Sequence, residues 1–261
     1  MTAPAPGADA PGDWDGATYD RIAGPQARWG GAVLDLLQLS GDERVLDAGC
    51  GSGRVTEQLL DRFPGVSVVA LDAAPSMLAE ARGRLARFGG RVELVEADLT
   101  RPLPLGGVPV DAIVSTAALH WVLDHDRLFR HLAAALRPGG RLVAQCGGEG
   151  NIDTVVSALR HLGRFEPSPW LFATPDDTRR RLEGAGFTGV DAWLHEEPTP
   201  FDGDDSLHTF LATVVLRSHL DRLPVADQQP LVEAVARLVP DRVLDYVRLT
   251  MVATRAQHSA H

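Results

Sequence analysis

Lysine is absent from this chain: all 25 of its basic residues are arginine. A Walker-type phosphate loop ends in Gly-Lys, protein kinases use a lysine against the ATP phosphates, and Schiff-base enzymes need a lysine amine. The composition therefore excludes these three mechanisms before any motif is considered.

Cysteines and long apolar runs are also scarce. Cys50 and Cys146, the two cysteines, form no C-x-x-C pair and indicate no disulfide framework, which favours a reducing compartment. No apolar run has the length of a membrane span, and residues 1–13 have neither the basic start nor the apolar middle of a signal peptide. We expect a soluble cytoplasmic protein with no membrane partner.

Charge and length set further bounds. A net charge of −10 argues against a duplex nucleic-acid partner, which requires a concentrated basic face. The 261 residues, 44% of them hydrophobic, suffice for one core with an added subdomain. Residues 1–13 are rich in Ala, Pro, Gly and Asp and are predicted to be a disordered tail before a single domain over residues 14–256. The oligomeric state stays open between a monomer and a homodimer.

Three glycines in five positions follow a short apolar run near the start of the domain. Arg44–Asp47 is predicted to be a buried parallel strand, Gly49, Gly51 and Gly53 come next, and Arg54–Phe63 has the apolar stripe of an amphipathic helix. Strand, glycine turn and helix form the first half of a βαβ nucleotide site, in which glycines let the backbone approach a ligand. The alternative is an ordinary tight turn between a strand and a helix.

The spacing of the glycines distinguishes between ligands. In the dinucleotide pattern G-x-G-x-x-G the third glycine falls where this chain has Arg54, which disfavours a nicotinamide-dependent oxidoreductase. The run D-A-G-C-G-S-G resembles motif I of the class I S-adenosylmethionine-dependent methyltransferases. The resemblance implies S-adenosylmethionine as cofactor, S-adenosylhomocysteine as product, and an α/β fold: a Rossmann-like seven-stranded sheet, mostly parallel, with the seventh strand antiparallel and helices on both faces. A non-catalytic module that binds S-adenosylmethionine or a partner is the other alternative.

Acidic residues mark the ends of three predicted strands, at Asp47, Asp72 and Asp98. Because ligands of open α/β sheets bind at the carboxyl ends of the strands, three acids at one edge favour a nucleoside site. Asp72 ends the strand Val66–Asp72, where a carboxylate accepts hydrogen bonds from both ribose hydroxyls; the alternative is a helix N-cap. Asp98 follows the strand Arg91–Glu96 and resembles the acid with which the family reads the adenine amino group; the alternative is an Asx-turn.

The resemblance adds further candidate cofactor contacts. Leu99 adjoins the adenine-reading acid, Ser115 ends the predicted strand Val110–Ser115, and Met77 opens a helix from which it lines the adenine or packs in the core. In the family the helix before motif I commonly lies across the cofactor, which implies contacts from Tyr19 and Gln26 to the methionine end. The alternative for that helix is that it simply covers the sheet edge.

His120 and Trp121 stand in the loop that the resemblance places beside the transferred methyl group. The imidazole of His120 titrates near neutrality, so it is a candidate general base or donor that orients the substrate. It is equally a candidate structural histidine, or a metal ligand with Asp124 and His125, although this cluster lacks a recognised ligand spacing and Asp124 fits an N-cap better. Trp121 is either a wall of the substrate site or a core residue. No metal site is predicted.

The run A-L-H-W-V at Ala118–Val122 narrows the resemblance. With the following helix and R-P-G-G-R-L it is most similar to the trans-aconitate methyltransferase type of small-molecule enzymes. Those usually have Gln at the position of His120, which counts against trans-aconitate as substrate. The loop Ser115–Ala118 lacks the Asn/Asp-Pro-Pro-Tyr pattern of enzymes that methylate nucleic-acid amino groups. We expect in-line methyl transfer to a small molecule, with O-methylation of a carboxylate or hydroxyl favoured and C- or N-methylation left open.

A long segment separates the last two predicted strands, Val190–Glu197 and Asp245–Arg255. A hairpin needs only about 2–5 residues there, whereas this segment carries two helical patterns, Ser206–Leu220 and Ala226–Val239. We expect an α-helical cap over residues 201–241 that covers the active-site edge and forms the substrate pocket. The alternative is a helical dimer contact.

Overall fold

The computed structural model describes residues 24–257, with side chains from Trp29 onward. The predicted tail and Tyr19 lie outside the described residues. Gln26 belongs to helix α2 (Gly24–Leu37), but its side chain is also outside them. The predicted contacts of Tyr19 and Gln26 to the cofactor therefore stay predictions.

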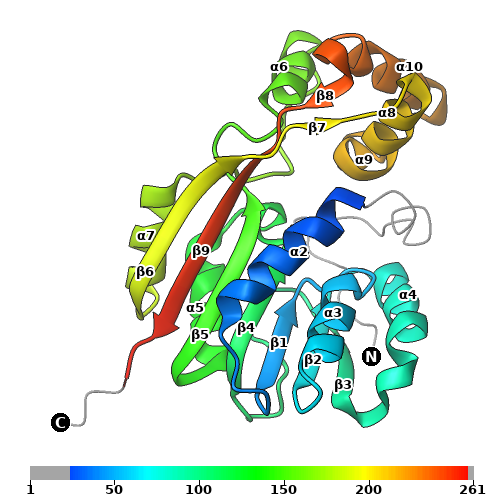
Figure 1. Ribbon diagram of the computed structural model, residues 1–261. Coiled ribbons are helices and arrows are strands. Elements are labelled where there is room, and N and C mark those ends of the chain that lie inside the picture. Colours follow the sequence, from blue (N-terminus) through cyan, green and yellow to red (C-terminus); the bar gives the residue numbers. More distant parts are fainter. Residues whose placement is uncertain (1–23, 258–261) are drawn as a thin grey trace, which may run out of the picture.

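One seven-stranded sheet forms the centre of the molecule, in the order β3-β2-β1-β4-β5-β9-β6 (Figure 1). The last strand in sequence, β9, is antiparallel to both of its neighbours, and the other pairs are parallel. This confirms the predicted sheet. The strands are β1 (Arg44–Ala48), β2 (Ser67–Asp72), β3 (Val92–Glu96), β4 (Val110–Thr116), β5 (Leu136–Gly147), β6 (Phe187–Glu196) and β9 (Val247–Arg255).

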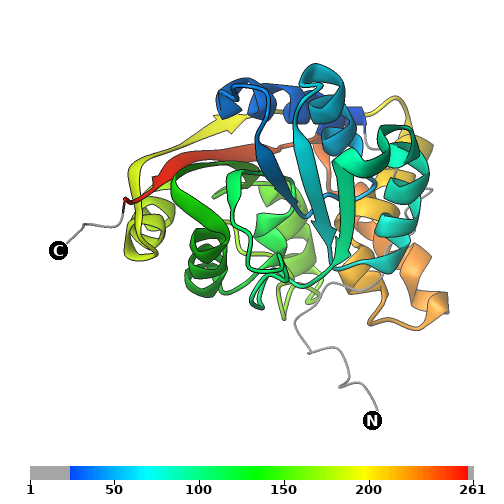
Figure 2. The same ribbon diagram turned by 90° about the horizontal axis from the view of Figure 1, so that it is seen from below.

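Helices cover both faces of the sheet, as Figure 2 shows for α2 and α3 on one side and α5 and α7 on the other. Neighbouring residues of β1 therefore enter different cores: Val45 packs with α2, α3 and α4, whereas Leu46 packs on the face of α5 and α7. Strands buried on both faces have continuous apolar sequences, which is why their positions could be predicted. These helices are α3 (Arg54–Arg62), α4 (Pro75–Leu85), α5 (His125–Ala135) and α7 (Pro175–Gly184).

Side-chain caps begin two of these helices. The Oδ1 atom of Asp124 accepts a hydrogen bond from the Arg127 N–H at 2.9 Å, and Thr174 Oγ1 accepts one from the Asp177 N–H at 3.0 Å. Each bond satisfies one of the backbone donors that a helix start leaves without a partner. Asp124 is thus used as an N-cap.

A helical cap lies beyond the end of the sheet at which β9 begins, shown at the top of Figure 1. Because β9 is antiparallel, this is also the edge at which the parallel strands end. The cap helices share a third hydrophobic core, which includes Trp29 and Trp170. The cap consists of α6 (Asp153–His161), α8 (Asp204–Phe210), a π-helical turn (Leu211–Val215), α9 (Arg217–Leu220) and α10 (Val225–Ala236), with the two short strands β7 (Thr199–Pro200) and β8 (Val243–Leu244) paired at its base.

The cap differs in two respects from the one expected between the last two strands. It also takes in α6, which comes from the connection between β5 and α7. The pattern predicted as one helix over Ser206–Leu220 is divided into α8, the π-helical turn and α9. The cap is therefore built from two separate segments of the chain.

Candidate active site

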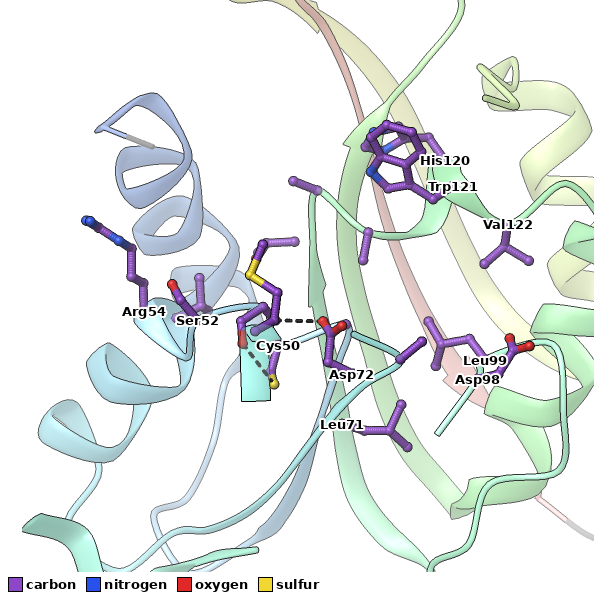
Figure 3. Close-up of a pocket in the computed structure, with 18 of the residues that line it drawn as sticks. Cys50, Ser52, Arg54, Leu71, Asp72, Asp98, Leu99, His120, Trp121 and Val122 are labelled. Carbon is purple, nitrogen blue, oxygen red and sulfur yellow. Dashed lines mark hydrogen bonds between the residues drawn. The ribbon is translucent and has the colours of Figure 1, made fainter. Parts of the chain in front are cut away.

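A cavity opens between the sheet edge and the cap. Its floor comes from the ends of β1, β2, β3 and β4, and its far wall comes from the cap and the start of β9. Figure 3 shows the glycine turn with Cys50 and Arg54 on one side, Asp72 in the middle, and His120 with Trp121 on the other side. The lining residues are Trp29, Gly49–Ser52, Arg54, Val55, Leu71–Ala73, Met77, Ala97–Thr100, Thr116–Ala118, His120–Val122, Val214, Tyr246 and Arg248.

The glycine turn requires glycine for two different reasons. Gly49, Gly51 and Gly53 have φ values of +82°, +54° and +81°, a region that other L-residues rarely adopt. A Cβ on Gly49 would also lie 2.3 Å from the Cβ of Ala118, whereas one on Gly51 would meet no protein atom within 4 Å. Gly51 lines the cavity, so its missing side chain leaves room for a ligand against the backbone.

Asp72 stands at the end of β2 and holds the glycine turn. Its Oδ2 atom accepts a hydrogen bond from the Gly51 N–H at 2.8 Å, and its Oδ1 atom accepts one from the Ala74 N–H at 2.9 Å. Burial raises the pKa of the Asp72 carboxyl, and these backbone bonds act against that rise. Each oxygen keeps a second lone pair, so the carboxylate has the capacity to accept the two hydroxyls of a ribose. The arrangement fits the predicted role.

The adenine side of the predicted site also faces the cavity. Asp98, Leu99 and Met77 all line it. Oδ1 of Asp98 accepts the Thr100 N–H at 2.8 Å, so the side chain forms the Asx-turn that was the structural alternative. The turn leaves the other oxygen available, so the two interpretations are compatible.

Three predicted cofactor residues lie away from the cavity. Asp47 is completely buried behind the glycine turn, Gly53 begins α3, and the Ser115 hydroxyl donates to the Ala48 carbonyl at 2.6 Å. None of the three is among the lining residues. Their positions support the turn from beneath and give no support to a direct contact with the cofactor.

The environment of Asp47 raises its pKa to about 7. Burial is the largest cause; a hydrogen bond from the Thr56 hydroxyl, at 2.5 Å, lowers the pKa, and the nearby charge of Asp72 raises it. The other oxygen, Oδ1, has no hydrogen-bond partner within the described part of the chain. Asp47 is therefore mainly the neutral acid in the folded protein at pH values below about 7.

This raised pKa predicts a pH dependence of stability. The folded state holds a proton on Asp47 that the unfolded state releases near its ordinary pKa of 3.8. Raising the pH from about 4 to about 7 therefore destabilises the fold, by up to about 1.4 kcal/mol per pH unit. We expect Asp47→Asn to remove this part of the slope. Urea unfolding of both proteins without ligand, at a series of pH values, measures it; parallel curves would contradict the prediction.

His120 lies in the wall of the cavity as a neutral imidazole. The Gly147 N–H donates to its Nδ1 atom at 3.4 Å, so the ring proton is on Nε2. Burial lowers the pKa of His120 well below its ordinary value, and the charges of Arg248 and His125 lower it further. This tautomer has an N–H to donate and no lone pair free to take a proton. Of the predicted roles, the geometry favours the orienting donor over the base.

The metal-ligand alternative for His120 finds no support. Asp124 caps α5, and the His125 Nε2 atom lies 3.0 Å from the Leu119 carbonyl oxygen. Over residues 24–257 no group of three or more His, Cys, Asp or Glu side chains is placed to hold a metal ion.

Arg248 is a site residue that the sequence analysis missed. It is 2% exposed, lines the cavity from the beginning of β9, and its guanidinium carbon lies 4.2 Å from the centre of the Trp29 ring. The signal was an arginine inside the apolar strand V-R-L-T-M-V. Since an antiparallel last strand begins at the ligand-binding edge, an arginine near its start lies at that edge.

Comparisons with known proteins agree with this geometry. A family model described as a methyltransferase domain matches residues 45–140, from β1 to the start of β5. The trans-aconitate 2-methyltransferase of Methylobacterium nodulans is 35% identical over 182 residues, which are 70% of this chain and 67% of that protein. The enzyme of the same name from Paracidovorax citrulli is 29% identical over 264 residues, covering 94% of this chain and 99% of that protein.

Among solved structures, the Haemonchus contortus phosphoethanolamine N-methyltransferase 2 in complex with S-adenosyl-L-methionine matches with a TM-score of 0.62 at 18% identity. The match covers 93% of this chain and 57% of that one and concerns the fold.

Together, the sheet order, the glycine turn and the acid at the end of β2 define a class I methyltransferase site. The chain belongs to the S-adenosylmethionine-dependent methyltransferases and resembles the trans-aconitate 2-methyltransferases among them. It is an enzyme that uses S-adenosylmethionine and acts on a small molecule, as predicted. The comparisons thus favour the methyltransferase over the two alternatives, a nicotinamide-dependent oxidoreductase and a non-catalytic binding module. Over residues 24–257 no helix is long and apolar enough to cross a membrane.

Proposed function

We propose that this enzyme transfers a methyl group from S-adenosylmethionine to a carboxylate oxygen of a small organic acid. The observation that carries the proposal is the chemistry at the end of the cavity that is lined by His120, Trp121 and Arg248. We call it the acceptor end. The cation of Arg248 and the imidazole of His120 both line that end, and the Nδ1 atom of His120 is engaged by the Gly147 N–H, so His120 is not placed to remove a proton. The similarity to trans-aconitate 2-methyltransferases adds support, because trans-aconitate is a carboxylic acid.

One group of cavity residues is proposed to bind the methyl donor, and another group is proposed to bind the acceptor. S-adenosylmethionine supplies an electrophilic methyl group on a positively charged sulfur. In this proposal Asp72 and the glycine turn hold its ribose end, and Asp98, Leu99 and Met77 contact its adenine; the support is that all of them line one cavity. The chain contributes alignment and exclusion of water, which are the main needs of an in-line displacement.

The acceptor end selects for a nucleophile that needs no activation. A carboxylate is already ionised at neutral pH, so one of its oxygens can attack while the guanidinium of Arg248 binds the group. The Nε2–H of His120 gives a second, neutral donor that fixes the orientation. A phenol or an amine would first have to lose a proton. His120, the histidine among the described lining residues, has its Nδ1 lone pair engaged by the Gly147 N–H.

An acceptor panel tests the proposal directly. Purified enzyme is incubated with methyl-labelled S-adenosylmethionine and small acids, including trans-aconitate, beside the matching amides, phenols and amines. We expect label only in the acids, as methyl esters that release methanol in alkali. Transfer to phenols or amines with none to acids would refute carboxylate methylation.

Two substitutions of His120 separate its roles. We expect His120→Gln to keep activity within about tenfold, because the glutamine amide also places an N–H donor there. His120→Ala should lose about 10- to 100-fold in kcat/KM, the worth of one such hydrogen bond at a desolvated site. The depressed pKa further predicts a kcat/KM profile without an ionisation of His120 between pH 6 and 9. A general base would behave differently: the glutamine variant would be as inactive as the alanine variant.

We also propose that the acceptor is not a nucleic acid and that the enzyme is cytoplasmic. The net charge of −10 supports an acceptor that is not a nucleic acid. Cys50 and Cys146 are buried free thiols, which supports a reducing, cytoplasmic location. The helical cap is proposed to be the wall of the acceptor site, in a monomer or homodimer; light scattering distinguishes these two states.

A further inference from the structure

A single turn of π-helix interrupts the cap where it meets the cavity. Residues Leu211–Val215 form this turn, and the Leu216 N–H donates to the Leu211 carbonyl five residues back, at 2.7 Å. Such turns carry one extra residue and recur at functional sites, because they change the direction of the side chains around them. Here the affected side chain is Val214.

Among the residues of α8, the π-helical turn, α9 and α10, Val214 is the one that lines the cavity. Val214 and its neighbour Val215 both pack in the cap core, but of the two only Val214 lines the cavity. Val214 is therefore the residue of this turn that both packs in the cap and faces the cavity.

The same end of the cavity has aromatic walls. The rings of Trp29 and Tyr246 pack edge to face at 5.2 Å between centroids, and the guanidinium of Arg248 lies over Trp29. Trp121 lines the cavity beside His120 and reaches the cap through Trp170, at 6.0 Å between centroids. A carboxylate held by Arg248 and His120 thus has its remaining atoms among Trp29, Tyr246, Trp121 and Val214.

We propose that the acceptor is a carboxylic acid with an apolar body, and that Val214 sets the size of that body. The inference rests on the proposed function, since it needs the acid group at Arg248. Apolar walls favour an apolar body because each buried methylene strengthens binding by about fourfold. The gain stops where the body meets Val214, since close-packed cap residues behind that side chain leave no room for further atoms.

A series of straight-chain monocarboxylic acids tests this inference, with kcat/KM measured against chain length. For the wild type we expect a rise of about fourfold per methylene up to an optimum, followed by a fall. Val214→Ala should move the optimum to longer acids by one or two carbons, and Val214→Ile should move it to shorter ones. The matched control is Val215→Ala, which removes the same atoms from the cap core and should leave the optimum unchanged. S-adenosylhomocysteine affinity should be the same in all four proteins, which also shows that each one is folded.

Three results would overturn the inference. An optimum that stays in place in both Val214 variants removes Val214 as the size limit. Faster methylation of trans-aconitate than of every monocarboxylic acid contradicts the apolar body while leaving carboxylate methylation intact. If the wild type esterifies no acid in the series or in the acceptor panel, the proposed function itself fails, and the inference with it.

Discussion

Replacing Asp72 with alanine is expected to weaken the binding of S-adenosylhomocysteine by about 100-fold or more and to abolish measurable turnover. The carboxylate is placed to accept two ribose hydroxyls, and hydrogen bonds to a charged group contribute about 1.5–3 kcal/mol each. The same carboxylate also holds the glycine turn through the Gly51 N–H. Isothermal titration with S-adenosylhomocysteine measures the loss, and circular dichroism confirms that the variant is folded.

Asp111 provides a matched control for this experiment. It too accepts a backbone hydrogen bond, from the Arg44 N–H at 2.8 Å, but it lies at the beginning of β4, at the opposite end of the sheet. Asp111→Ala should lower stability and leave ligand affinity unchanged. A folded Asp72→Ala protein that binds S-adenosylhomocysteine as tightly as the wild type would show that Asp72 only supports the glycine turn and does not contact the ligand.

Replacing Arg248 with methionine is expected to lower kcat/KM for the acid by about 100-fold or more, mainly through a higher KM. Removing one partner of a buried charge-assisted contact generally costs about 2–5 kcal/mol. Methionine keeps an apolar stem against Trp29, over which the guanidinium lies. Because Asp72 and the glycine turn are untouched, the affinity for S-adenosylhomocysteine should stay within about threefold of the wild type. Arg248→Lys should fall between the two, since it keeps the charge and loses the two-pronged geometry.

The control for this substitution lies on the same strand. Arg255, at the other end of β9, donates to the Ala185 and Gly186 carbonyls, so Arg255→Met removes an arginine without touching the cavity. Its kinetic constants should match those of the wild type. If Arg248→Met instead reduces stability while its kcat/KM for acids stays normal, Arg248 is a structural residue of the cap interface.

The sheet and the glycine turn were predictable because the constraints on them are local. A parallel strand covered on both faces is a continuous apolar run, and the turn after β1 needs glycines where φ is positive. The acids that end strands follow directly from those runs. Asp47 shows the limit of this reasoning: its position at a strand end resembles that of Asp72, but its side chain points into the protein interior.

The acceptor end was less predictable because its constraints come from distant parts of the chain. The apolar stripe of α6 shows that one face is buried but not that the cap buries it. A π-helical turn differs from an α-helix by a single residue, which leaves no clear pattern in the sequence. Arg248 became recognisable as a site residue only when the start of β9 was placed opposite the glycine turn.

The pairing of β7 with β8 at the base of the cap allows the cap segment between them to vary independently of the central sheet. The chain leaves the sheet after Glu196, which is paired with Val247, and Thr199 of β7 is paired with Leu244 of β8. The segment between β7 and β8 thus begins and ends in paired strands, so that its two ends are joined by backbone hydrogen bonds. A replacement segment of different length or sequence can be spliced between those ends without altering the order or register of the central strands. The part of the cavity wall that this segment supplies, Val214, can therefore change while the strands that carry the glycine turn and Asp72 stay the same.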